Sequence, residues 1–241
     1  MQNSFFRQRL GWLMCMFGAV ILLGALTYNE VASVQTAALQ PVSELTLIID
    51  PGHGGDDGGA VSSDGIQEAD VNLSIAKRLD ALAKLCGLPT CLTRESEEID
   101  YPPEASTIAA RKVADQKQRA ALINATFNGV LISIHQNQYP TAQPRGAQVL
   151  YAATPESEPF GTLLHERLVT LLDPDNRRVA APISEDVYLM RQIQCPGVLV
   201  ECGFLSNPDE CKRLCSDAYQ IQLSVTMLSA YLDYFQNGMK Q

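Results

Sequence analysis

The most informative part of this chain is the stretch Ile49-Asp50-Pro51-Gly52-His53-Gly54-Gly55. The apolar run Leu45 to Ile49 leads into it and predicts a buried strand. Proline and glycine do not continue a strand ladder easily, so we expect the strand to end here. The first residue after the break is a histidine between two glycines. A second histidine, His135, follows the apolar run Val130 to Ile134 in the same way.

Strands and helices alternate along the rest of the chain. Apolar residues recur at helical spacing in some segments and form short continuous runs in others. The expected strands are Leu45–Asp50, Thr90–Thr93, Val130–Ile134, Ala147–Ala152 and Val198–Glu201, and the expected helices are Asp70–Leu85, Thr107–Ala125, Pro159–Leu172 and Tyr219–Phe235. This alternation is typical of a mainly parallel sheet covered on both faces. We therefore expect a single α/β domain.

Three polar residues lie at the expected carboxyl ends of strands: His53, His135 and Glu201. In open α/β sheets, functional residues collect at that edge. Histidine is the commonest metal ligand. A carboxylate at the end of a buried strand is costly unless it is paired, hydrogen-bonded or bound to a cation. The pattern therefore indicates a metal site at one edge of the sheet.

A catalytic zinc keeps three protein ligands and one open position, and the two histidines supply two of the three. Glu68 is the best candidate for the third, because it lies in a loop that can fold back over the strand end. Asp56, Asp57 and Asp70 compete for this role on spacing alone. Glu201 is then the base that takes a proton from water and passes it to a leaving group. These residues together predict a metal-dependent hydrolase acting on an amide or ester.

The charge of the chain narrows the classes of function. The 241 residues carry a formal net charge of −9, whereas a nucleic-acid-binding protein is expected to show a basic footprint. We therefore expect no nucleic acid among the partners. The third histidine of the chain, His165, lies within an expected helix and has no partner nearby in sequence. We interpret it as structural.

The N-terminal segment predicts export. Arg7 and Arg9 precede an uncharged apolar stretch from Leu10 to Leu26, which is typical of a signal peptide or a single membrane anchor. We assign residues 1–28 to this segment, which would contact the membrane, and residues 29–43 to a linker. For an exported chain, disulfides are expected more often than in the cytosol. Cys86–Cys91, which flanks an expected turn, is the first candidate, with unpaired thiols as the alternative.

Several motifs occur in an order that resembles a known family. They are Asp50-Pro51-Gly52-His53-Gly54-Gly55, Asp57-x-Gly59-Ala60, Glu68, Thr93-Arg94, Arg119-x-x-x-x-Asn124, Ser133-Ile134-His135-Gln136-Asn137 and Val200-Glu201-Cys202-Gly203-Phe204-Leu205-Ser206-Asn207. Together they resemble the zinc-dependent N-acetylmuramoyl-L-alanine amidases of type 3, which are bacterial cell-wall hydrolases. The narrower similarity is to the spore-cortex, germination-type amidases.

The resemblance implies a catalytic domain over residues 44–238 with a six-stranded, mainly parallel mixed sheet flanked by helices. It also implies one Zn²⁺ per chain held by His53, Glu68 and His135, with Glu201 as the catalytic glutamate. The implied reaction is hydrolysis of the amide between N-acetylmuramic acid and L-alanine of peptidoglycan. Arg191 and Asn137 are weaker candidates for contacts with substrate.

The implied setting is the cell wall or the spore intermembrane space, with a role in cortex maturation through muramic-lactam formation or in wall remodelling. A regulatory or recruiting protein is an expected partner. Two alternatives stay open. One is a non-catalytic wall-binding or regulatory protein with the same fold, and the other is a zinc peptidase that cuts within the stem peptide.

Overall fold

The structure is a computed structural model that describes residues 45–237. Its six strands form one sheet in the order β2-β1-β3-β6-β4-β5. The strands are β1 (Thr46–Pro51), β2 (Thr90–Leu92), β3 (Gly129–Asn137), β4 (Gln148–Tyr151), β5 (Ala181–Pro182) and β6 (Gly197–Phe204). The helices are α2 (Glu68–Leu85), α3 (Ile108–Ala125), α4 (Ser157–Leu172), α5 (Tyr188–Gln192), α6 (Pro208–Leu214), α7 (Asp217–Leu232) and the π-helix η1 (Asp233–Asn237). The expected single α/β domain with a six-stranded sheet is confirmed.

The sheet is mixed but mainly parallel. β1 pairs in parallel with β2 and β3, and β3 pairs in parallel with β6. β4 runs antiparallel to β6, and β5 runs parallel to β4. The parallel part therefore brings the carboxyl ends of β1, β3 and β6 to one edge, as the sequence predicted.

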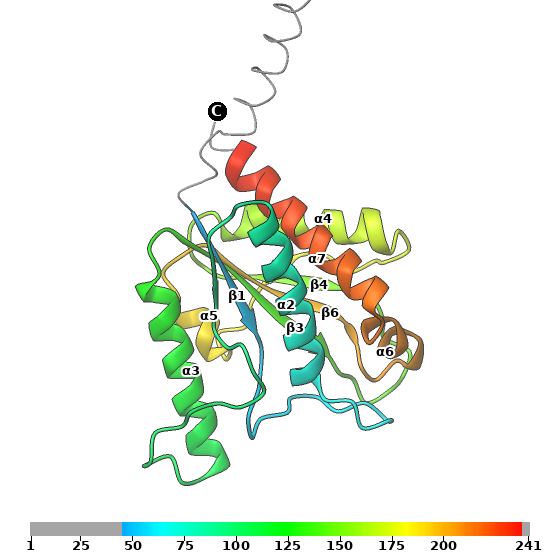
Figure 1. The fold of residues 1–241 in the computed structure, drawn as a ribbon. Coiled ribbons are helices and arrows are strands. Elements are labelled where there is room, and N and C mark those ends of the chain that lie inside the picture. The colour runs from blue at the N-terminus through cyan, green and yellow to red at the C-terminus, as the bar shows by residue number, and fades with distance from the viewer. Residues whose placement is uncertain (1–44, 238–241) are drawn as a thin grey trace, which may run out of the picture. The chain divides into compact units, whose positions relative to one another are not determined.

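Helices cover the two faces of the sheet with separate apolar clusters. On one face, Val71, Ile75 and Leu79 of α2 pack with Leu223 and Met227 of α7 and with the strands. Figure 1 shows α2 and α7 lying side by side across the sheet. On the other face, α3 and the short α5 pack against one side of β1, β3 and β6. Side chains that alternate along a strand are therefore divided between two environments.

The observed strand ends differ from the expected ones. β3 continues to Asn137 and β6 to Phe204, so His135 lies within a strand rather than after it, and Glu201 lies inside β6 rather than at its end. α2 begins at Glu68 itself, two residues before the expected start. β5 and α5 were not predicted, because two and five residues are too few for a periodic pattern to be read.

A buried ion pair fixes the turn that follows β1. Asp50 is 1% exposed and accepts hydrogen bonds from Thr93 Oγ1 and Ser133 Oγ, each at 2.6 Å. Arg119 Nη1 lies 2.8 Å from Asp50 Oδ1. Burial raises the pKa of Asp50, but the charge of Arg119 and the two hydroxyl groups outweigh burial and hold it below its usual value. The guanidinium of Arg119 also donates to the carbonyls of Pro51 and His53.

The cysteine pair Cys86–Cys91 is not a disulfide, because both residues are free. Cys86 is the exposed residue that caps the C-terminus of α2, on one side of the sheet. Cys91 packs in the cluster beneath α3, on the other side, where Thr126 Oγ1 lies 3.8 Å from its sulfur. The two thiols therefore lie on opposite sides of the sheet. Their short separation in sequence, across an expected turn, does not predict this arrangement.

The predictions for residues 1–28 and 29–43 lie outside the described residues, as do the outermost residues of the expected 44–238 domain. Among the helices of residues 45–237, none combines the length and apolar character needed to cross a membrane.

We predict that Asp50→Asn lowers the free energy of unfolding by about 3 kcal/mol at neutral pH, because it removes the more deeply buried of the two carboxylates, Asp50 and Asp115, that pair with Arg119. Urea denaturation measures this change. Arg177→Gln is the control, since Arg177 belongs to an exposed pair with Asp175 whose side chains are 80% and 83% exposed.

The same ion pair makes the free energy of unfolding depend on pH. The folded-state pKa of Asp50 is lowered, so its contribution is present above the unfolded value near 4 and is lost as the pH falls through the folded value. The difference between wild type and Asp50→Asn should therefore shrink in acid. A loss of stability no larger than that of Arg177→Gln would contradict the account.

Candidate metal centre

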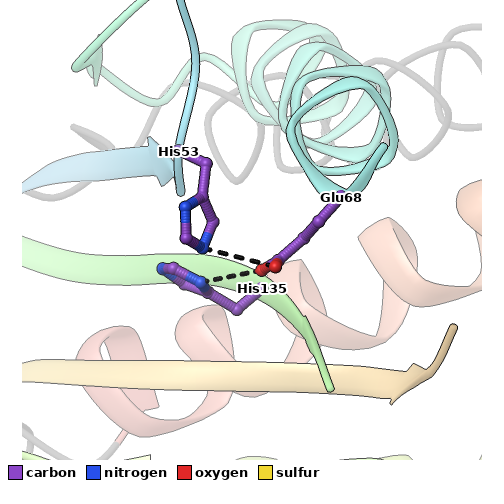
Figure 2. A group of neighbouring side chains, drawn as sticks. All are labelled: His53, Glu68 and His135. Atoms are coloured by element: carbon purple, nitrogen blue, oxygen red, sulfur yellow. Dashed lines mark hydrogen bonds and ion pairs between the residues drawn. The ribbon is translucent and has the colours of Figure 1, made fainter. Parts of the chain in front are cut away.

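Three side chains from three elements converge at the carboxyl edge of the sheet. His53 follows β1, Glu68 is the first residue of α2, and His135 lies in β3 (Figure 2). Nε2 of His53 is 3.3 Å from Oε2 of Glu68, and Nδ1 of His135 is 3.0 Å from Oε1 of the same carboxylate. One ligand atom from each of the three lies within 4.8 Å of the other two. The group could therefore hold a metal ion.

Glycines beside the cluster make room for its side chains. A Cβ added to Gly52 would lie 2.2 Å from the ring of His135, and one added to Gly59 would lie 2.6 Å from Oε2 of Glu68. His53 itself has a φ of 60°, in the left-handed region that non-glycine residues rarely adopt. Such strain persists only where the surrounding structure imposes it, as the bond from Arg119 to the His53 carbonyl does here.

The carboxylate of Glu68 is oriented by backbone donors. The amide of Ala60 donates to Oε2 at 2.9 Å, and the amide of Gln136 donates to Oε1 at 3.0 Å. Burial raises the pKa of Glu68, but the hydrogen bonds and charges of His135 and His53 outweigh burial and hold it well below its usual value. Glu68 is therefore an ionised, buried carboxylate that faces both imidazoles and could bind a metal ion.

The competing aspartates take other places. Asp57 accepts from Nδ1 of His53 at 3.0 Å and pairs with Lys112 at 2.8 Å, so it directs Nε2 of His53 towards Glu68. Burial lowers the pKa of His53, whereas Asp57 and Glu68 raise it, to a net value of about 9. Asp56 pairs with Arg111, and Asp70 is exposed on α2.

Asn72 and Arg94 join the segments that carry the cluster, and no role was predicted for Asn72 from the sequence. Asn72 is fully buried, donates to the Gly52 carbonyl at 3.1 Å and accepts from Gln136 Nε2 at 3.1 Å. Arg94 donates to the carbonyls of Gly52 and Ala69, at 3.1 and 2.8 Å. The sequence feature that could have revealed Asn72 is its position four residues after Glu68, on the apolar face of an expected helix.

Glu201 lies opposite His135 in the register of β3 and β6. Its Oε2 is buried and has no hydrogen-bond partner among the described residues. Burial raises the pKa of Glu201 to about 6, while the nearby His135 lowers it and Glu68 raises it. A buried carboxylate oxygen without a partner, beside a cluster of two imidazoles and a second carboxylate, fits a site that is completed by a cation and a water.

Neither weaker candidate contacts the cluster. Arg191 is exposed on α5 and donates to the Glu185 carbonyl at 3.1 Å, and Asn137 ends β3. No hydrogen bond among residues 45–237 joins either side chain to the three converging groups. A cavity of about 60 Å³ beside both histidines is lined by Leu189 and Met190, the neighbours of Arg191.

Comparisons with known proteins identify relatives. The family model Amidase_3, described as N-acetylmuramoyl-L-alanine amidase, matches residues 47–230. The germination-specific N-acetylmuramoyl-L-alanine amidase of Bacillus subtilis (strain 168) is 34% identical over 232 residues, covering 95% of this chain and 96% of that protein.

Solved structures of N-acetylmuramoyl-L-alanine amidases are also similar to this chain. The CwlD amidase from Clostridioides difficile, in complex with the GerS lipoprotein, matches with a TM-score of 0.76 and 32% identity, over 80% of this chain and 99% of that one. An N-acetylmuramoyl-L-alanine amidase from Clostridium difficile 630 matches with a TM-score of 0.68 and 27% identity, over 80% and 97% of the two chains. The resemblance in the ordered motifs is confirmed, and this chain belongs to the Amidase_3 family of N-acetylmuramoyl-L-alanine amidases.

Proposed function

We propose that the chain hydrolyses the amide between N-acetylmuramic acid and L-alanine in peptidoglycan, using one zinc ion held by His53, Glu68 and His135. The observation that carries this proposal is the convergence of two imidazoles and an ionised carboxylate beside Glu201. Two nitrogens and one carboxylate oxygen are a donor set that suits a catalytic zinc, and three protein ligands leave a position open.

When bound, the zinc supplies Lewis acidity for the carbonyl and the water. Glu201 takes a proton from the attacking water through its unpartnered carboxylate oxygen and returns it to the nitrogen of the departing alanine. Its raised pKa, about 6, places it near the operating pH, where a group can both accept and donate a proton efficiently. Asp57 holds Nδ1 of His53, so that Nε2 faces the site.

The biological setting is also part of the proposal. The similarity to a germination-specific amidase supports a role in spore-cortex maturation, through muramic-lactam formation, or in wall remodelling. The protein would then be exported and act at the cell wall or in the spore intermembrane space. The solved complex of the CwlD amidase with a lipoprotein supports a regulatory protein partner for this chain as well.

Arg191 and Asn137 stay proposed substrate contacts. Support for Arg191 comes from its place on α5, whose preceding residues line the cavity beside the histidines. Support for Asn137 comes from its place two residues beyond His135 on the same strand.

The bond that is cut tests the proposed reaction. Mass spectrometry of peptidoglycan digests should show free stem peptides with a new L-alanine amine. Cuts confined to the peptide would instead indicate a zinc peptidase, and the absence of any cut by the zinc-loaded protein would indicate a wall-binding protein with the same fold.

We predict that Glu201→Gln lowers kcat by about 10²–10⁴-fold, because the amide side chain cannot carry the proton. Zinc content, measured by inductively coupled plasma mass spectrometry, should stay at the wild-type level. Glu166→Gln, an exposed position on α4, is the matched control and should keep full activity. Full activity in Glu201→Gln would overturn the assigned base.

We predict that wild-type protein binds about one zinc ion per chain. His53→Ala and His135→Ala should both lose most of this zinc, because each removes one of three ligands. His165→Ala is the control, since His165 packs in α4 and bonds to the Arg178 carbonyl at 2.8 Å. Chelation should abolish activity and added zinc should restore it. Equal zinc in all three variants would contradict the ligand assignment.

A further inference from the structure

A row of polar side chains leads away from the metal centre across the sheet. His135 on β3 is paired with Glu201 on β6, and Glu201 is paired with Gln148 on β4. Residues paired directly across neighbouring strands point to the same face. Leu131 and Leu199 point to this same face of the sheet, because they lie an even number of residues from His135 and Glu201 on their strands. Both pack in the apolar cluster with α3 and α5, so these two helices cover part of this face. Each step along the row spans about 4.8 Å, the spacing of neighbouring strands.

Arg178 lies at the far end of this row. Its Nη1 donates to Oε1 of Gln148 at 2.5 Å, and its guanidinium lies 4.6 Å from the centre of the Phe204 ring. Its backbone is held on both sides, because its amide donates to Oδ1 of Asn176 at 3.0 Å and His165 Nε2 is 2.8 Å from its carbonyl. The structural role expected for His165 is therefore to fix the segment that carries Arg178.

The charge of Arg178 has no counter-ion among residues 45–237. No carboxylate of that part of the chain lies within ion-pair distance of it, and no acceptor there is bonded to its Nη2. Arg119 and Arg167, by contrast, pair with Asp50 and Asp233. A half-buried guanidinium, pre-positioned and without a carboxylate, is suited to bind one from a ligand.

The direction of the substrate follows from the proposed function, on which this inference rests. Glu201 must reach the nitrogen of the departing alanine, so the leaving peptide lies over β6. The following residue is about 3.8 Å further along the chain, a distance close to the spacing from β6 to β4. A leaving peptide that runs from β6 towards β4 would bring that residue beside Gln148 and Arg178.

We propose that Arg178 is a specificity-determining residue that binds the carboxylate of the residue following the alanine in the stem peptide. Three carboxylates, Asp57, Glu68 and Glu201, lie at or beside the two histidines, and the whole chain carries a net charge of −9. An acidic peptide approaching such a site is repelled unless a local cation receives it. Arg178 supplies that cation one residue away from the cut.

Two synthetic disaccharide dipeptides test the proposal. One carries L-alanine followed by D-glutamine, whose α-carboxylate is free and whose γ-carboxyl group is an amide, and the other carries the α-amide of D-glutamine, which has no carboxylate, in its place. Wild-type enzyme should cut the free acid about 10- to 100-fold faster in kcat/KM, the range of one charge-assisted interaction. The difference should lie mainly in KM, since the contact exists in both ground state and transition state.

Arg178→Gln should abolish this preference by weakening only the free acid, and Arg178→Lys should retain part of it. Arg177→Gln, at the exposed neighbouring arginine, should keep the wild-type preference. Zinc content and melting temperature verify that each variant is folded. Equal cutting of both substrates by wild type, or an equal loss on both in Arg178→Gln, overturns the inference and leaves the proposed function standing. Failure of wild type to cut either substrate overturns the proposed function as well.

Discussion

The rest of the site depends on the buried ion pair between Asp50 and Arg119. It closes the end of β1, where proline and glycine have removed the ladder, and Arg119 also binds the carbonyls of Pro51 and His53. The chain therefore leaves the sheet along one defined path, with His53 in a strained left-handed conformation. A charge pair this deeply buried contributes specificity of conformation more than net stability, because its desolvation offsets much of its attraction.

Around this fixed turn, hydrogen bonds between segments hold the cluster of His53, Glu68 and His135 together. Asn72 joins α2 to the turn and to β3, and Arg94 joins the same turn to the first turn of α2. The three converging side chains thus come from elements whose relative positions are set by hydrogen bonds within the protein. Preorganisation of this kind lets a site hold its ligands at the distances a metal requires without reordering the chain.

Local patterns in the sequence were sufficient for the main elements and for the two histidines with Glu201, because buried apolar strands and their ends are visible residue by residue. Local patterns were not sufficient to choose Glu68 over Asp57 as a metal ligand. Both carboxylates lie near His53 in sequence, and only the folded loop separates their roles. The family resemblance favoured Glu68, which the structure brings together with both histidines, and its role as a metal ligand stays a prediction. Arg178 could not be found, because its segment has no periodicity and contacts between distant elements place it.

Anomalous diffraction at the zinc absorption edge from crystals of the purified chain tests the central claim most directly. The account predicts one strong peak per chain, about 2.0–2.2 Å from one nitrogen of each of His53 and His135 and from an oxygen of Glu68. A peak elsewhere, a ligand set that includes a cysteine sulfur, or no peak in protein purified with zinc would contradict it.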